Sequence, residues 1–139
     1  MTGKAAVGAL LLAAVIVSGA CGRDSGSSSG ADREVQVEIR DSRFVPDHFE
    51  FEAGTTVTFV VQNTDPIDHE FLIGDEQVQQ AHEEGTEAHH GAKPGEISIP
   101  IGETRTTTYT FTEPGRLLIG CHLPTHYDFG MRGTITVTE

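Results

Sequence analysis

Residues 117–137 read LLIGCHLPTHYDFGMRGTITV, and this stretch decides the fold. It has an apolar segment of strand character at each end and a loop with proline and glycine between them. Because proline and glycine favour turns, the chain is expected to curl back between two neighbouring strands. Cys121, His126 and Met131 stand at five-residue steps in this loop. The curl therefore directs a thiolate, an imidazole and a thioether toward one point.

These side chains are ligands of the kind that bind copper. Methionine is a poor ligand for zinc, whereas a thiolate with a thioether suits both oxidation states of copper. A trigonal site needs a second imidazole from outside the loop, and His69 follows a predicted strand at the matching end of the domain. Two histidines, a cysteine and a distant axial methionine form the ligand set of blue copper sites. The sequence therefore predicts one copper ion held by His69, Cys121, His126 and Met131. The alternative is that Cys121 is only a small buried apolar residue.

The N-terminal region has the features of an export signal. Lys4 precedes an uncharged apolar run, and small residues come directly before Cys21. Residues 1–20 are therefore predicted to be a signal peptide of the lipoprotein type, after which Cys21 is lipidated and becomes the new N-terminus. An ordinary cleaved signal peptide and an uncleaved anchor helix are the alternatives. Residues 21–32 are rich in serine and glycine and are predicted to form a flexible tether.

The remaining residues, 33–139, are enough for one domain with a single hydrophobic core. Cys121 has no cysteine to pair with if Cys21 carries a lipid, which leaves its thiol available for a metal. The formal net charge of the chain is −12, and this acidity argues against nucleic acid as a partner. The acidic residues form either a docking patch or a diffuse acidic surface.

Most of the domain shows the strand period of two. This pattern predicts an all-β fold, a sandwich or barrel of short strands, and it covers residues 35–39, 49–51, 57–61, 97–101, 106–111, 117–119 and 135–137. Residues 75–95 are the exception because they are rich in Glu, Gln and His. We predict that they form an exposed, mobile insertion between strands of the two sheets, with one short helix starting near Asp75.

Several histidines lie outside the predicted copper site. His82, His89 and His90 fall in the insertion, where histidines are usually solvated, although neighbouring glutamates leave a second metal site open as the alternative. His122 is expected to face away from Cys121, because successive side chains of a strand point to opposite sides. His48 is expected to point outward for the same reason, since Phe49 belongs to the apolar face.

The chain resembles the cupredoxins of the plastocyanin, azurin and rusticyanin group. The resemblance covers nearly all of the predicted domain, and its motifs are Phe44-x-Pro46, Phe51-x-x-Gly54-x-x-Val57-x-Phe59, Asn63, Asp68-His69-x-Phe71 and Cys121-x4-His126-x4-Met131 followed by Gly133-Thr134-Ile135. It implies a Greek-key β-sandwich with copper at one end, and it makes His126 the partly exposed imidazole through which electrons pass. Glu70 departs from the small polar residue that commonly follows the first histidine. A carboxylate there would change the potential or the colour of the site, or compete for the copper.

The insertion, with the sequence that follows Cys121, also resembles periplasmic cupredoxins linked to copper tolerance, although this insertion contains no methionine. The sequence thus supports two hypotheses. The first is a lipid-anchored, extracytoplasmic one-electron carrier, a monomer whose partners are redox proteins at the outer face of the membrane. The second is a copper-binding protein for sequestration or tolerance. An enzyme is not expected, because oxidases pair this kind of site with further histidine clusters and further domains.

Overall fold

The structure is a computed structural model that describes residues 1–3, 32–85 and 93–139. Most of the predicted signal peptide (residues 4–20), most of the tether with Cys21 (residues 21–31), and His89 and His90 lie outside the described residues. The elements are β1 (Arg33–Arg40), β2 (Arg43–Val45), β3 (His48–Glu52), β4 (Thr56–Asn63), β5 (His69–Gly74), α1 (Glu76–Gly85), β6 (Glu96–Ile99), β7 (Thr104–Thr110), β8 (Gly115–Gly120) and β9 (Arg132–Thr138).

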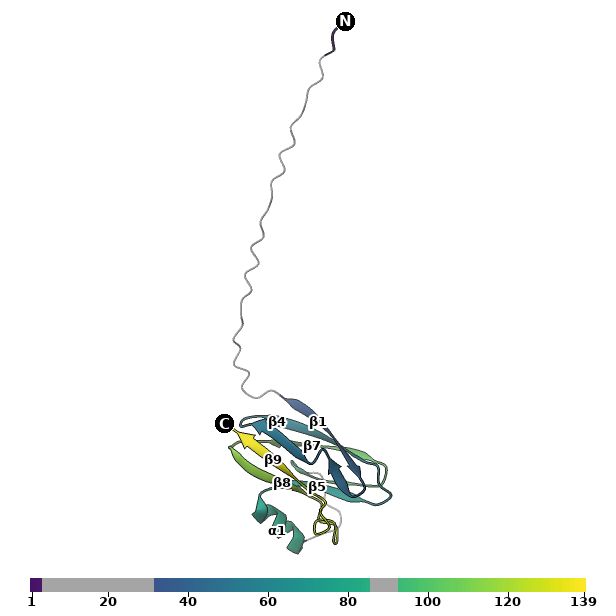
Figure 1. The fold of residues 1–139 in the computed structure, drawn as a ribbon, viewed down its shortest axis with the longest axis vertical. Coiled ribbons are helices and arrows are strands. Elements are labelled where there is room, and N and C mark those ends of the chain that lie inside the picture. The colour runs from purple at the N-terminus through teal and green to yellow at the C-terminus, as the bar shows by residue number, and fades with distance from the viewer. Residues whose placement is uncertain (4–31, 86–92) are drawn as a thin grey trace.

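The strands form two sheets stacked face to face (Figure 1). One sheet has the order β2-β1-β4-β7, and the other has the order β3-β9-β8-β5-β6. The pairs β1–β4 and β3–β9 are parallel, while the remaining pairs are antiparallel. The prediction of an all-β sandwich is confirmed. Strands such as β3, β4 and β9 were predictable because their apolar side chains point inward at every second position. Strand β5, which is buried along its whole length and shows no such alternation, was not predicted from the sequence.

Aromatic side chains fill the space between the sheets. Phe59 of β4 is fully buried and contacts the rings of Phe49, Phe51, Phe71 and Phe111. Edge-to-face and stacked pairs of this kind stabilise a core beyond the apolar area that they bury. One predicted inward position is wrong. Ile101 is 57% exposed, because β6 ends at Ile99 and the chain turns before the alternation is complete.

Helix α1 forms where the sequence predicts a short helix, but its surroundings differ from the prediction. It packs on the outer face of β5, all of whose residues are buried. Gly74 makes room for it, because a Cβ atom there would come 2.4 Å from the side chain of Val78. The expectation that this stretch is exposed is therefore wrong for Gln79, which is 3% exposed. The helix follows β5 and precedes β6, which are neighbours in one sheet, so the expected position between the two sheets is also wrong.

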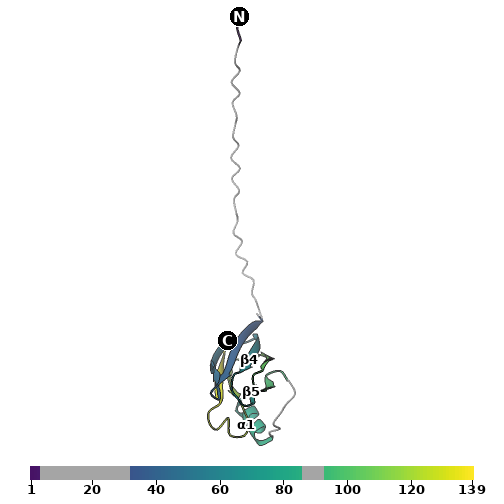
Figure 2. The ribbon, with the colours of Figure 1, turned by 90° about the vertical axis from the view of Figure 1, so that its right-hand side faces the viewer.

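The two ends of the domain differ in what they carry. The C-terminus and the start of β1 lie at one end, whereas α1 lies at the other (Figures 1 and 2). The loop of residues 121–131, coloured yellow-green, lies at the same end as α1 in both views. Within the described residues, no helix combines the length and the apolar character needed to cross a membrane.

Candidate metal centre

The structure brings His69, Cys121 and His126 together. His69 begins β5, Cys121 directly follows β8, and His126 comes from the loop between β8 and β9. One ligand atom from each of the three residues lies within 4.8 Å of the others. The Cys121 Sγ atom is 4.0 Å from His69 Nδ1 and 3.3 Å from His126 Nδ1. Strands distant in sequence therefore deliver the ligands that the sequence predicts.

These separations fit a metal ion. With the bond lengths typical of zinc, about 2.3 Å to sulfur and about 2.0 Å to nitrogen, a trigonal ion separates sulfur from nitrogen by roughly 3.8 Å. The distances of 4.0 Å and 3.3 Å lie on either side of this value. Cys121 and His69 are fully buried, while His126 is half-buried. A soft, enclosed donor set with one partly exposed imidazole fits copper.

Asp65 fixes the orientation of the His69 ring. Its Oδ2 atom lies 3.0 Å from His69 Nε2, so that nitrogen donates a hydrogen and Nδ1 is left to face Cys121. The carboxylate also accepts the backbone N–H groups of Asp41 and Ser42. Burial acts to raise the pKa of Asp65, but these hydrogen bonds and His69 hold it below its usual value. The carboxylate therefore stays ionised and orients the imidazole.

Sequence reasoning missed Asp65, which bonds directly to the ring of His69. Asn63 supports it by accepting the Asp65 N–H at Oδ1, while Asn63 Nδ2 donates to the carbonyls of Ile67 and Ile99. Asn63 ends β4 at a buried position of its alternation, whereas Asp65 lies in the loop that follows and belongs to no periodic pattern. The one available signal was an aspartate four residues before a candidate histidine ligand.

The loop of residues 121–131 is closed by its own backbone. The Met131 N–H donates to the carbonyl of His126, and the Cys121 N–H donates to the carbonyl of Met131. Met131 is fully buried. Backbone hydrogen bonds therefore join Met131 to both of the other predicted ligands in this loop. Ligation by the Met131 sulfur stays a prediction.

The protonation states of the ligands follow from burial. Burial raises the pKa of the Cys121 thiol to about 11, although the N–H groups of Glu70 and Leu123 oppose the change. Burial lowers the pKa of His69, with His126 adding to the effect, and it also lowers the pKa of His126. The protein without metal therefore has neutral imidazoles and a neutral thiol near pH 7. Metal binding must displace the thiol proton.

Glu70 and His122 point away from the cluster. Glu70 is 3% exposed, and its Oε2 atom lies 3.6 Å from His82 Nε2 on the side covered by α1. This follows from strand geometry, because His69 before it faces the core. His122 is 2% exposed and contacts α1, which confirms that it faces away from Cys121. His48 is exposed as predicted, and its Nδ1 atom lies 2.7 Å from the hydroxyl of Thr134.

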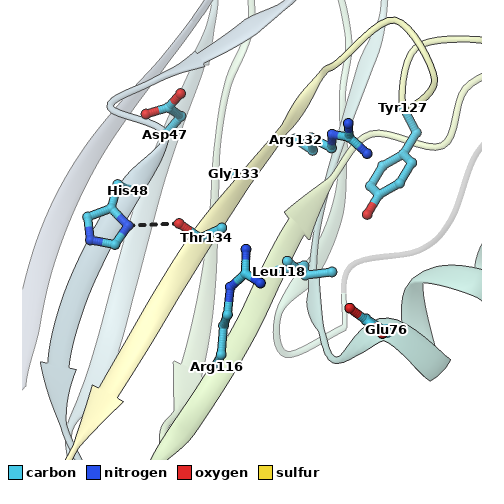
Figure 3. Close-up of a pocket in the computed structure, with 9 residues that line it drawn as sticks. All are labelled: Asp47, His48, Glu76, Arg116, Leu118, Tyr127, Arg132, Gly133 and Thr134. Carbon is cyan, nitrogen blue, oxygen red and sulfur yellow. Dashed lines mark hydrogen bonds between the residues drawn. The ribbon is translucent and has the colours of Figure 1, made fainter.

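A separate polar pocket of about 560 Å³ lies over β8 and β9 (Figure 3). Its lining has both charge signs, with Arg116 and Arg132 beside Asp47 and Glu76. The lining includes none of the three residues of the cluster. Arg116 and Arg132 do not converge on one point in Figure 3, where the Arg132 side chain turns toward Tyr127. The pocket is therefore not part of the metal centre.

Comparison with known proteins agrees with this geometry. Residues 31–138 match the family described as copper binding proteins, plastocyanin/azurin family. Two relatives are each named copper-resistant cuproprotein CopI. The protein from Rubrivivax gelatinosus is 32% identical over 116 residues, which cover 81% of this chain and 70% of the relative. The protein from Pseudomonas aeruginosa is 28% identical over an alignment of 139 positions, and this alignment covers 77% of each chain.

A solved structure of auracyanin B has the same fold, with a TM-score of 0.64 and 23% identity. The match covers 77% of this chain and 89% of auracyanin B. The family match spans the whole sandwich, and the cluster of His69, Cys121 and His126 supplies the donor set that copper requires. The chain therefore belongs to the plastocyanin/azurin family of copper binding proteins.

Proposed function

We propose that the chain is a type 1 copper protein that carries one electron at a time, with copper ligated by His69, Cys121, His126 and Met131. The observation that carries the proposal is the cluster of three ligand atoms within 4.8 Å, held at one end of a closed sandwich. When bound there, copper supplies a centre that alternates between the cupric and cuprous states. A rigid ligand set changes little between these states, which favours fast electron transfer.

Each ligand has a separate role in the proposal. The Cys121 thiolate gives the strong bond, and the imidazoles of His69 and His126 complete the plane. The Met131 thioether tunes the potential from the axis. Phe129 is 75% exposed and belongs to the same loop as the half-buried His126. We assign this apolar surface to docking of a redox partner, so that electrons pass through the His126 ring.

The proposed setting is extracytoplasmic. A lipid on Cys21 would tether the domain to the membrane, and residues 21–32 would let it reach redox proteins at the outer face. The proposal treats the protein as a monomer without enzymatic turnover. Mass spectrometry of the protein from its native membrane tests the anchor, because a lipidated Cys21 gives a fixed mass increase and a new N-terminus. A mature chain that lacks this modification would refute it.

The visible spectrum and the voltammetry of the copper-loaded protein test the carrier. We expect an intense absorption near ~600 nm from the copper–thiolate bond, which is absent in Cys121→Ser, and a reversible one-electron couple. Met131→Leu keeps the bulk of the side chain but removes the axial sulfur, so it should shift the potential while copper uptake continues. A cupric form without the thiolate band would remove the basis of the proposal.

A second function is favoured by the relatives named copper-resistant cuproproteins and by the net charge of −12, which attracts cations. In this reading the protein withdraws copper from the extracytoplasmic space. Survival of cells in copper distinguishes the two functions when Met131→Leu replaces the natural protein. If copper tolerance is unchanged while turnover of redox partners falls, electron transfer is an activity separate from tolerance, and the carrier is favoured. Tolerance that falls in Cys121→Ser with the copper it no longer holds, while turnover of redox partners is unchanged in Met131→Leu, favours sequestration.

A further inference from the structure

The inner face of α1 is polar rather than apolar. Gln79, His82 and Glu83 stand at spacings of three and four residues, which places them on one side of a helix. Gln79 is 3% exposed, and its Nε2 atom donates to the carbonyls of Leu72 at 3.3 Å and Leu118 at 3.2 Å. These two bonds fix the orientation of the amide. They leave its Oε1 atom to accept a hydrogen bond.

His122 is the partner of that oxygen. Its Nε2 atom lies 2.6 Å from Gln79 Oε1, and its Nδ1 atom lies 2.6 Å from Glu83 Oε2, so both ring nitrogens face hydrogen-bond acceptors. The ring also stacks on Tyr127 with centroids 4.6 Å apart and planes 19° apart. A Cβ atom at position 120 would come 2.4 Å from Gln79 Oε1, so glycine is required beside this contact. The ring is therefore fixed on both edges and on one face.

The outer face of Tyr127 is also covered. The Arg132 guanidinium lies over the Tyr127 ring, 5.6 Å from its centroid, and Figure 3 shows the two side chains beside each other above α1. Tyr127 and His126 are adjacent in the loop. The stack on His122 thus links the loop that carries His126 to the residue that follows Cys121.

Helix α1 holds the residue after His69 in a similar way. His82 Nε2 lies 3.6 Å from the Oε2 atom of Glu70, which is 3% exposed. The backbone N–H of Glu70 in turn donates to Cys121 Sγ at 3.3 Å. The residues that directly follow His69 and Cys121 are therefore both buried under the same helix.

Because of the backbone geometry, these contacts restrict the directions in which the ligand side chains point. In β5 successive side chains point to opposite faces, and Cys121 and His122 directly continue β8, so fixing one side chain of each pair restricts the direction of its neighbour. Coverage of β5 and β8 alone would need only apolar side chains on α1. Buried hydrogen bonds with both partners in place instead specify one arrangement. The amide of Gln79, with each of its polar atoms bonded, is such a specifying group.

We propose that α1 is a positioning element for the copper centre, in which Gln79 and His122 set the direction of the Cys121 thiolate. This inference rests on the proposed copper function but assigns a role to residues outside the ligand set. Gln79 and His122 are positioning residues, because they act through the backbone of Cys121. Groups that orient metal ligands typically change metal affinity by about 10- to 100-fold when they are replaced.

Gln79→Met tests the inference, since methionine keeps the volume and removes the hydrogen bonds of the amide. We expect cuprous affinity about 10- to 100-fold weaker, together with a shifted thiolate absorption and a shifted potential. Gln80→Met is the matched control, because Gln80 is exposed on the same helix and bonds only to Glu84 among the described residues. Its affinity, absorption and potential should equal those of the natural protein.

A measurement without metal separates this inference from the proposed function. Three-bond couplings in the metal-free protein report the side-chain rotamer of Cys121, which should be single in the natural protein and averaged in Gln79→Met. His122→Phe keeps the stack on Tyr127 and carries the test if Gln79→Met does not fold. The combined variant should lose less affinity than the product of the single losses, because the two residues act together.

Two outcomes would overturn the inference. The first is a folded variant at position 79 or 122 whose Cys121 rotamer, copper affinity, absorption and potential are all unchanged. In that case α1 would only cover β5. The second is an equal loss of copper affinity in Gln80→Met, which would show that any change on the helix has the same effect. If the natural protein bound no copper but the rotamers changed as expected, the proposed function would fail while the positioning role of α1 remained.

Discussion

The proton on Cys121 should control copper affinity between pH 7 and pH 10. Burial raises the pKa of this thiol to about 11, which is about four units above pH 7. Copper requires the thiolate, so apparent affinity at pH 7 should be about 10⁴-fold below its alkaline limit, which corresponds to about 5 kcal/mol. Each rise of one pH unit should strengthen binding about tenfold.

The imidazoles should not add to the pH dependence of copper affinity between pH 7 and pH 10. Burial lowers the pKa values of His69 and His126 from 6.5, so both rings are neutral above pH 7. Each copper ion should therefore release one proton, the one from Cys121. At pH values low enough to protonate the two rings in the metal-free protein, which lie below the usual pKa of histidine, the release should increase.

Two assays measure this dependence. Anaerobic competition with a coloured cuprous chelator, corrected for the protonation of the chelator, gives the affinity at each pH. Calorimetry in buffers of different ionisation enthalpy counts the released protons. In Cys121→Ser the weaker residual binding should show no slope above pH 7. Release of no proton by the natural protein would mean that the thiol is ionised before copper binds, which would refute the argument from burial.

Three further predictions concern the frame of the site. Asp65→Asn should weaken cuprous affinity about 10- to 100-fold, because the amide orients His69 less strongly, and an unchanged affinity in the same competition assay would contradict this. Gly133→Ala should lower the free energy of unfolding in urea by about 1–3 kcal/mol, because its Cβ atom would come 2.4 Å from the carbonyl oxygen of Asp47, and an unchanged urea midpoint would argue against it. The metal-free protein should lose stability as pH rises from 9 toward 11, because the unfolded thiol, with its ordinary pKa of 9.0, ionises before the folded one with its pKa of about 11. The total change should be about 3 kcal/mol, and it should vanish in Cys121→Ala, which thermal unfolding at several pH values can check.

Local chemistry made much of the site predictable. Cys121, His126 and Met131 lie within one loop, so their ligand types and spacing can be read directly from the chain. His69 could be placed because the end of a strand has few possible positions in a sandwich. The structure brings Cys121, His126 and His69 together as expected. Met131 is buried in the same loop, and its role as a ligand stays a prediction.

Features that depend on hydrogen bonds between distant segments were not predictable. Asp65 receives the N–H groups of a turn 23 and 24 residues away, and no periodic pattern marks such a pairing. The contact of Gln79 with His122 spans 43 residues. The inner face of α1 is made of polar side chains, so a search for apolar periodicity cannot identify it as a buried face.

The alternation of apolar residues along short strands, and the thiolate, imidazole and thioether of one loop, can be read from the chain because both properties belong to short stretches of it. The groups that orient these ligands come from distant parts of the chain and follow only from the folded arrangement. Asp65 bonds to His69, and Gln79 of α1 bonds to His122. These hydrogen bonds form only when the segments that carry the partners pack together, so the sequence alone does not reveal them.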